Sequence, residues 1–458
     1  MRSSLLIASG CAVLVSIAGC AASRPEAALP EPRPLGRELS IPAGSAFQSE
    51  NVTPPDGASA LPDSVSLRDV LVLALQHNPD LAVYAWEIRA RDAAALQAGL
   101  FPNPTLSTER ENFGGSLAAD GADRTQTTTQ LTVPLELGGQ RGGRKRVALL
   151  TRDLSGWDYE AARLDVVAET LRRAADLHGA QEHLELASQA KGTAQQMLET
   201  VAARADAGKV SPVEVTRARV VVATAEIERA RAVQELGAAR ARLAALWGQL
   251  PVNGGIPSFQ IDLGESETVP PPDLNALASQ LPLNPDLARR DTEVAQREAQ
   301  LSHERRSRIP TIALGGGYRR FEGTGDHAFV GTLGLTLPLF NRNQGAVRAA
   351  RFGLSRSEAE RRSTETRLHA ELAAAHSRLE ASYSEMITLQ NEVVPAAERT
   401  FRDIEEGYRL GKFGFLDVLD AQRTLAELRL QLVGARVHYY HAAADVERLT
   451  AAPLLSRF

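Results

Sequence analysis

The chain has 458 residues, a formal net charge of −5, and 43% hydrophobic but only 5% aromatic residues. This length can bury a sizeable core, which alanine, leucine and valine must build in long, closely packed helices because aromatic residues are scarce. The slightly acidic balance argues against nucleic acid as a partner, since a surface that binds nucleic acid needs an excess of basic residues.

The first twenty residues have the pattern of an export signal. A basic start, Met1-Arg2, precedes an apolar stretch from Leu5 to Ile17 that is too short to span a bilayer, and the cleavage-site sequence Ile17-Ala18-Gly19-Cys20 follows. The pattern resembles a bacterial lipoprotein signal. This resemblance implies removal of residues 1–19, lipidation of Cys20 and, because Ala21 is not aspartate, sorting to the outer membrane. An ordinary secretory signal with an unmodified cysteine is the alternative.

The segment after the signal, residues 20–64, is rich in proline and is predicted to be a lipid anchor and linker. Cys11 lies within the signal, so the mature chain keeps one cysteine and cannot form an internal disulfide. No later segment has eighteen uninterrupted apolar residues, and any membrane crossing is therefore expected to use strands.

Two helices are predicted to open the folded part of the chain. Ser66 is a capping residue for a short helix that ends near His77. Asn78-Pro79 begins the next helix, because proline in the first helical turn loses no hydrogen bond. This second helix runs to about Leu100, where two following prolines end it.

A pair of strands follows, over Thr105–Asn112 and Gln126–Glu136, with a Gly/Ala/Asp loop at 114–123 between them. In the second strand, alternate residues share one face: Thr127, Thr129, Leu131, Val133 and Leu135. Such short, weak alternation is typical of a barrel strand with lipid on one face and water on the other. A strand of a soluble sandwich has a similar pattern and remains the alternative.

A long helical hairpin comes next. From about Gly139 to Ala205 there is no proline, and apolar residues recur at spacings of three and four. About 65 helical residues reach about 100 Å, which no compact globular domain needs. The chain then turns at Gly208-Lys209-Val210-Ser211 and returns as a helix from about Val213 to Trp247.

The same order then recurs. Asn78-Pro79-Asp80 matches Asn284-Pro285-Asp286, Gly208-Lys209 matches Gly411-Lys412, and the offset falls only from 206 to 203 residues. A unit of about 200 residues has therefore been duplicated, as repeats at 65–248 and 273–458 around a Pro/Gly-rich linker at 249–272. The second repeat is predicted to have strands at Thr311–Arg320 and Ala328–Leu339. A long helix follows at Asn343–Arg409, with a kink at Pro395. The chain then turns at Gly411-Lys412-Phe413-Gly414 and returns as a helix at Leu416–Leu449.

Four strands cannot close a membrane barrel, because the smallest such barrels have about eight. An open edge in hydrocarbon would leave unpaired backbone groups, so several chains must share one barrel. Three chains would give twelve strands and two would give eight. The predicted fold class is mainly α with a membrane β-barrel.

The repeats, strand pairs and hairpins together resemble the TolC family of outer-membrane efflux proteins over essentially the whole mature chain. The stretches Asn103-Pro104, Glu111–Gly115 and Leu135–Arg141 are similar to the CzcC branch, which serves heavy-metal pumps of the resistance-nodulation-division type. The resemblance implies a homotrimer with a twelve-stranded barrel and a periplasmic α-helical tunnel. It also implies a periplasmic adaptor (membrane fusion protein) and an inner-membrane pump as partners, with the channel held in outer-membrane lipid.

Candidate functional residues surround the second turn. Asp417 and Asp420 are three apart and share a helix face, so a trimer would place up to six carboxylates in a cation-attracting ring. The resemblance implies that this ring lies at the periplasmic entrance, that Tyr408 belongs to the gate, and that Glu214 is its acidic hydrogen-bond partner. The tips expected to dock the adaptor are Gly208, Lys209, Val210 and Ser211 in one turn and Gly411, Lys412, Phe413 and Gly414 in the other.

Phe413 departs from the family pattern, because a well-known member has an arginine there that helps to lock the gate. Arg409 or Lys412 is expected to substitute for it. The alternative interpretation is that Asp417 and Asp420 are ordinary carboxylates at a helix start and that Tyr408 is a packing residue.

Other motifs give no site. The basic glycine-rich segment 138–146 lacks the ending of a phosphate-binding loop, and His178 and His183 are five apart, which does not suit zinc ligands on one helix face. His303 has no ligand set around it, and no nucleophile motif is present. We therefore expect no enzyme activity, no cofactor and no metal site.

The sequence predicts the outer-membrane channel of a tripartite efflux system that exports heavy-metal cations of the cobalt, zinc and cadmium type. A duct for drug efflux or protein secretion is the alternative within this class. A periplasmic adaptor would need two lipoyl-like β halves around one hairpin, whereas this chain has two hairpins and two strand pairs. An anchored enzyme is disfavoured because the sequence offers no catalytic site.

Overall fold

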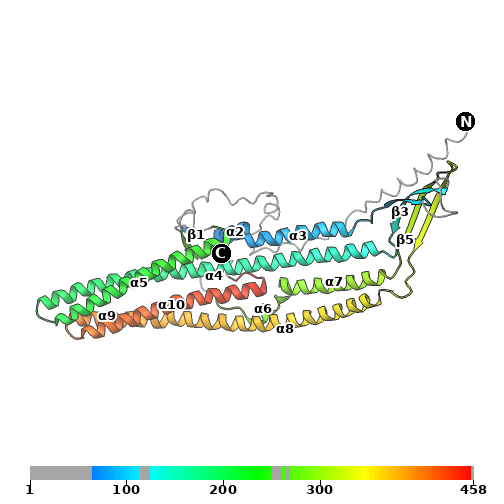
Figure 1. Cartoon of the computed structure of the whole chain (residues 1–458). Coiled ribbons are helices and arrows are strands. Elements are labelled where there is room, and N and C mark those ends of the chain that lie inside the picture. Colours follow the sequence, from blue (N-terminus) through cyan, green and yellow to red (C-terminus); the bar gives the residue numbers. More distant parts are fainter. Residues whose placement is uncertain (1–63, 114–123, 250–258, 264–268, 455–458) are drawn as a thin grey trace. The chain divides into compact units, whose positions relative to one another are not determined.

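The computed structural model describes residues 64–113, 124–249, 259–263 and 269–454. The predicted signal at 1–19, Cys20, and the predicted anchor and linker up to residue 63 lie outside the described residues. Within them the chain is mainly helical, and the order of elements repeats once (Figure 1).

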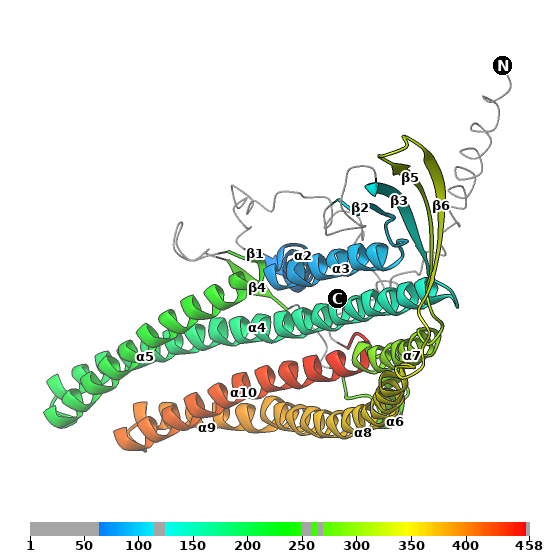
Figure 2. The ribbon, with the colours of Figure 1, turned by 45° about the vertical axis from the view of Figure 1, so that its right-hand side comes forward.

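The first repeat consists of β1 (Ser64–Ser66), α2 (Leu67–His77), α3 (Pro79–Ala98), β2 (Thr105–Glu111), β3 (Gln126–Leu135), α4 (Gln140–Asp206), α5 (Pro212–Ala244) and the short turn η3 (Ala245–Trp247). The second consists of α6 (Leu274–Ala278), η4 (Leu281–Leu283), α7 (Pro285–Arg306), β5 (Ile312–Phe321), β6 (His327–Leu335), α8 (Gln344–Thr388), η5 (Leu389–Val393), α9 (Val394–Arg409) and α10 (Phe415–Thr450). Helix α5 packs along α4, and α10 along α9, as two hairpins (Figure 2).

The repeated Asn-Pro-Asp motif joins two helices in each repeat. Asn78 caps α3 by accepting hydrogen bonds from two backbone N–H groups at 2.9 and 3.2 Å, and its amide donates to the Leu246 carbonyl at 2.9 Å. Asn284 caps α7, and its amide donates to the Leu449 carbonyl at 2.8 Å. Only a side chain with both an acceptor and a donor can make these two contacts, which explains the asparagine.

The two long helices differ at one point. Helix α4 is uninterrupted over 67 residues, which corresponds to about 100 Å. In the second repeat the π-helical turn η5 separates α8 from α9 directly before Pro395, where the sequence predicted a kink. Proline lacks the N–H that the preceding turn needs, and a wider turn accommodates this loss. No helix in the described part of the chain is both long and apolar enough to cross a membrane.

The four long strands form one antiparallel sheet in the order β2-β3-β5-β6. Its register brings Leu131 beside Leu106, Leu314 beside Leu333 and Tyr318 beside Phe329 on one face. The other face is polar: it carries Thr128, Gln130, Arg319 and Thr332, with Arg319 donating to Thr128 at 2.8 Å and Thr332 donating to Gln130 at 3.0 Å. The sheet therefore has an apolar and a polar face, as the alternation predicted.

The predicted extension of the last strand to Leu339 is wrong, because β6 ends at Leu335. Its partner β5 begins at Ile312, directly opposite Leu335, so later residues have no strand to pair with. Pro310 and Pro338 have no N–H to extend the ladder.

The segment between the repeats is more than a linker. Its residues Gln260–Asp262 form β4, which pairs in parallel with β1 at the start of the first repeat. Phe259, Ile261 and Leu263 are buried in the main core. A three-residue strand between Gly- and Pro-rich stretches is too short to give a periodic signal in the sequence.

Most of the main core consists of small and branched residues of α2, α4, α8 and α10, and α5 and α7 add further members. Alanine allows the helices to approach closely, and α4 uses a glycine where it packs against α10. A Cβ added to Gly179 would lie 2.6 Å from Cγ2 of Val437. The ion pair of Arg172 with Asp445, at 2.6 Å, ties the same two helices together.

Gly179→Ala is expected to destabilise the protein, although alanine favours a helix over glycine by about 1 kcal/mol. The added methyl would force α4 and α10 apart, and overpacking of this kind costs about 1–3 kcal/mol. Thermal unfolding followed by circular dichroism in detergent measures the change. Gly192→Ala on the same helix is the control, since a Cβ there meets nothing within 4 Å. It should be neutral or stabilising, and equal losses in both variants would contradict the prediction.

Candidate functional site

A second apolar cluster, the tip cluster, packs the two hairpins against each other near their turns. Its buried members come from α4, α5, α9 and α10: Met197, Val201, Ala218, Tyr408, Phe415 and Val418. Because one cluster takes residues from all four helices, each hairpin end stabilises the position of the other. The predicted gate tyrosine lies inside this cluster.

Both turns between the helices depend on a glycine with positive φ. Gly208 has φ 70° and Gly411 has φ 76°, values that residues with a Cβ rarely adopt. Lys209 and Lys412 follow these glycines, and their N–H groups donate to carbonyls of the preceding helix at 2.9 and 2.7 Å. The Gly-Lys sequence therefore recurs in both repeats because α4 and α9 end in the same type of turn.

The remaining tip residues begin the return helices or pack on the cluster. Ser211 caps α5 by accepting from the Val213 N–H at 3.3 Å, and Val210 packs against the tip cluster. Gly414 precedes α10 and has no side chain to cap it. The ring of Phe413 lies where a side chain at Gly407 would be, since a Cβ there would meet it at 2.3 Å.

Arg204, at the end of α4, holds Tyr408 from the other hairpin. Its Nη1 donates to the Tyr408 carbonyl at 2.6 Å, and its guanidinium carbon lies 4.4 Å from the centre of the tyrosine ring. The ring is 2% exposed and lies 6.2 Å from the ring of Phe415. Arg204 therefore makes a polar contact between the two hairpins at the tips.

The expected hydrogen bond between Tyr408 and Glu214 is not formed. The tyrosine Oη and the glutamate Oε2 are both buried and have no hydrogen-bond partner in the described part of the chain. Burial raises the pKa of Tyr408, and the nearby charge of Glu214 adds to this, while Arg204 opposes it. The two side chains are neighbours that interact through charge.

Neither expected substitute for the missing family arginine reaches the other hairpin. Arg409 pairs with Glu405 of its own helix at 2.8 Å, and its side chain is exposed. Lys412 is exposed on the turn. Arg204 makes the contact instead. Sequence reasoning missed it because a basic residue in the last turn of a helix is common and carries no special signal.

Asp417 and Asp420 lie on the exposed first turns of α10. Asp417 Oδ2 accepts a hydrogen bond from the Gly414 N–H at 2.8 Å, so this aspartate stabilises the helix start that glycine leaves uncapped. Asp420 is free to face solvent. Asp417 therefore fits the helix-start interpretation, and both carboxylates remain available to a shared ring.

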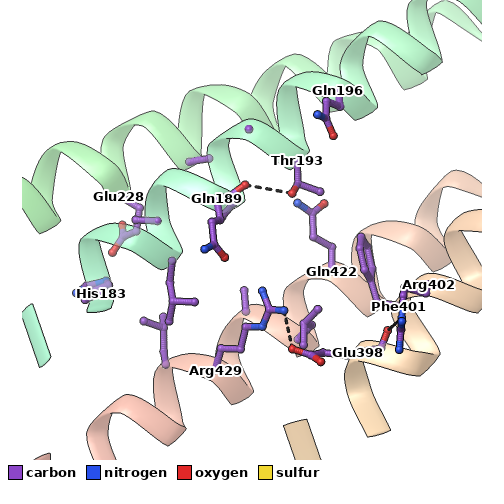
Figure 3. Close-up of a pocket in the computed structure, with 18 residues that line it drawn as sticks. His183, Gln189, Thr193, Gln196, Glu228, Glu398, Phe401, Arg402, Gln422 and Arg429 are labelled. Atoms are coloured by element: carbon purple, nitrogen blue, oxygen red, sulfur yellow. Dashed lines mark hydrogen bonds and ion pairs between the residues drawn. The ribbon is translucent and has the colours of Figure 1, made fainter. Parts of the chain in front are cut away.

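An open cavity of about 630 Å³ separates the tip cluster from the main core (Figure 3). It lies between the hairpins, and its walls come from α4, α5, α9 and α10. Its polar lining includes Gln189, Thr193, Gln422 and the ion pair of Arg429 with Glu398 at 2.6 Å. No sequence pattern indicated this gap, because helical periodicity does not report where two helices part.

The histidines noted in the sequence lie on the helices without forming a ligand set. His178 is 3.6 Å from Glu182, His183 Nδ1 is 3.0 Å from Glu235 Oε2, and His303 packs against Gly143. Across the described ranges, no three His, Cys, Asp or Glu side chains come together as metal ligands.

Comparison with known proteins agrees with this architecture. The family model described as "Outer membrane efflux protein" matches residues 70–249 and 277–452. The cobalt-zinc-cadmium resistance protein CzcC of Cupriavidus metallidurans is 33% identical over 90% of this chain and 99% of its own. The nickel-cobalt-cadmium resistance protein NccC of Alcaligenes xylosoxydans xylosoxydans is 28% identical over 64% of each chain.

Solved structures share the fold. The outer membrane protein VceC of Vibrio cholerae superposes with a TM-score of 0.69 at 20% identity, covering 84% of this chain and 96% of that one. The predicted fold class, with two tandem repeats of strand pair and helical hairpin, is confirmed. The matched family consists of outer-membrane channel proteins rather than enzymes. This chain belongs to the outer membrane efflux protein family.

Proposed function

We propose that the protein is the outer-membrane channel of a tripartite system that exports cobalt, zinc or cadmium ions from the periplasm to the exterior. The observation that carries the metal assignment is the 33% identity to a cobalt-zinc-cadmium resistance protein over 99% of that protein's length. The family match over 70–249 and 277–452 includes both strand pairs and both hairpins, which supports a role as a complete duct. Energy must come from the pump, here of the resistance-nodulation-division type, through a periplasmic adaptor.

The working form is a homotrimer. In the described chain β2 and β6 are the edges of a four-stranded antiparallel sheet, and each edge has unpaired backbone groups. Unpaired groups cost several kcal/mol each in hydrocarbon, so the edges must pair with those of other copies. Three copies give a twelve-stranded barrel, from which the helices continue as a periplasmic tunnel.

The repeats span 65–248 and 273–458, and the signal at 1–19 is removed. Cys20 is the lipid-anchored first residue of the mature protein, and the linker at 20–64 connects it to the fold. Mass spectrometry of the intact, detergent-solubilised protein tests both the lipid anchor and the trimer, because it gives the number of acyl chains on a subunit and the number of subunits. An unmodified monomer would contradict both.

Deletion of the gene should raise the cobalt, zinc or cadmium content of cells several-fold and lower their tolerance of these metals, because ions delivered to the periplasm lose their exit. Elemental analysis and growth in graded metal concentrations measure this. Restoration by the wild-type gene is the control. Unchanged metal tolerance together with lost drug resistance would instead support a drug-efflux duct.

In the proposed trimer, Asp417 and Asp420 form the periplasmic entrance ring. The exposed position of both carboxylates on one end of α10 supports this, as does their spacing of three residues. Low-dielectric walls focus the potential of such a ring and concentrate cations by about 10- to 1,000-fold. The neighbouring turns, Gly208–Ser211 and Gly411–Gly414, are the surface that docks the adaptor.

Asp417→Asn with Asp420→Asn should lower cation selectivity and weaken block by a trivalent cation about tenfold or more. Asparagine keeps the oxygen that accepts from the Gly414 N–H, so the helix start should survive while the charge is lost. Planar-bilayer recordings with the blocker on the periplasmic side measure the effect. Glu298→Gln with Glu358→Gln, exposed positions on α7 and α8, is the control. Block equal to that of the wild type would leave both aspartates as helix-start residues.

The contacts of Arg204 with the ring and the backbone carbonyl of Tyr408 keep the gate closed. This contact joins one hairpin to the other, whereas Arg409 is bound within its own helix. The cavity above the tip cluster supports the assignment, because it lets the hairpin ends separate without disturbing the main core. The gate therefore opens at the hairpin ends, where the small tip cluster packs the two hairpins together.

Arg204→Gln should raise the open probability about tenfold, since a hydrogen bond from a charged group contributes about 1.5–3 kcal/mol and 1.4 kcal/mol is a factor of ten. Tyr408→Phe should change little, because the hydroxyl it removes has no partner. Single-channel recordings compare the two. Arg217→Gln, an exposed site on α5, controls for loss of charge. A larger effect of Tyr408→Phe than of Arg204→Gln would overturn this account of the gate.

A further inference from the structure

Three distant segments meet where the strands join the helices. These are the first turns of α4, the end of α7 and the start of α8. Arg306 donates to the Gly139 carbonyl at 3.4 Å, and the Asn343 amide donates to the Glu304 carbonyl at 2.9 Å. The segments therefore form one surface at the end of the sheet.

This surface carries a group of basic side chains that we call the basic collar: Arg141, Lys145, Arg146, Arg305, Arg308 and Arg342. None of the six forms an ion pair with a carboxylate in the described part of the chain, and all except the half-buried Arg141 are exposed. The nearby carboxylates are fewer: Glu136 pairs with Arg144 at 2.7 Å, and Glu304 accepts from the neutral Asn343 amide at 2.7 Å. The collar therefore has an excess of positive charge.

Large apolar side chains border the collar on the sheet side. Phe101 is 70% exposed and Phe340 is 92% exposed, and Leu337 and Leu339 are exposed beside them. The guanidinium carbon of Arg141 lies 3.7 Å from the centre of the Phe101 ring. Exposed aromatic rings followed by arginine and lysine are typical of the boundary between hydrocarbon and water.

The local helix ends add to the positive potential. Neither α4 nor α8 has an acidic residue in its first turn or a side-chain cap. Carboxylates are favourable at a helix N-terminus and basic residues are unfavourable there. The sequence places Arg141 at one of these ends, an arrangement that an anion from outside the chain would stabilise.

We propose that the basic collar binds the phosphate groups of anionic phospholipids at the periplasmic surface of the outer membrane. The proposal rests on the strand pairs entering the membrane as described above. A lipid fits the surface better than a free anion, because its acyl chains extend past the exposed Phe101 and Phe340 while its phosphate stays beside the arginines. Each basic residue near an anionic lipid surface strengthens binding roughly five-fold.

The test compares the full-length protein with Arg141→Gln/Arg308→Gln/Arg342→Gln in detergent micelles containing either phosphatidylglycerol or phosphatidylcholine. Native mass spectrometry counts bound lipids, and thermal unfolding gives the stabilisation by each lipid. Phosphatidylglycerol should bind to and stabilise the wild type more than phosphatidylcholine does. The triple variant should lose this preference, with apparent affinity falling roughly 100-fold for three residues that each contribute about five-fold.

Two matched variants sharpen the result. The triple lysine variant at the same positions keeps the charge and should keep the preference for phosphatidylglycerol. Arg217→Gln/Arg219→Gln/Arg399→Gln removes three exposed arginines on α5 and α9 and should behave as the wild type. Equal responses to both lipids in the wild type, or an equal response to inorganic phosphate alone, would overturn the proposal.

Conductance in planar bilayers separates this inference from the proposed function. A triple glutamine variant that still conducts as a trimer but binds phosphatidylglycerol as the wild type does would overturn only the lipid site. A triple variant that falls apart into monomers in every lipid would also overturn it, because the collar would then pair with a neighbouring subunit. A wild type without channel activity would instead count against the proposed duct.

Discussion

The open edges of the four-stranded sheet are the constraint on which the rest of the molecule depends. Strands β2 and β6 each have one unpaired side, and hydrocarbon has no water to satisfy it. Once copies of the chain pair edge to edge, every helix that leaves a strand is fixed in a ring. Long helices that pack side by side then continue the duct, which explains why the chain uses rods rather than a compact domain.

The long helices have more buried residues in the main core than at the tips. This difference suits a duct whose tip end can move. The main core takes buried residues from most of the helices, whereas the tip cluster has six buried members. The cavity between the two hairpins lies beside the tip cluster, with Phe401 of α9 both in its lining and packed against that cluster. Segments with few buried contacts open at lower free energy than the core does. The tips are therefore the part of the chain best able to rearrange locally.

The sequence predicted the parts of the fold that depend on local signals. Helix starts at Ser66 and Asn78, the glycine turns and the break before Pro395 each follow from one residue's backbone chemistry. The sequence did not reveal β4 or the true end of β6, because both depend on a partner strand elsewhere in the chain. At the tips the sequence analysis named Tyr408, which is buried in the tip cluster, but not Arg204, which contacts it, since a contact between hairpins has no periodic pattern.

Duplication explains why some features match between the repeats and others do not. Gly139 and Asn343 occupy equivalent places at the starts of α4 and α8, and both adopt positive φ, which asparagine tolerates better than most residues. The asparagine caps are likewise kept in both repeats, because each must join a helix start to a helix end. The tips have diverged: one hairpin supplies Arg204 and the other supplies Tyr408. This contact can break while both hairpins stay intact, because the main core, which lies farther from the tips, continues to hold them together.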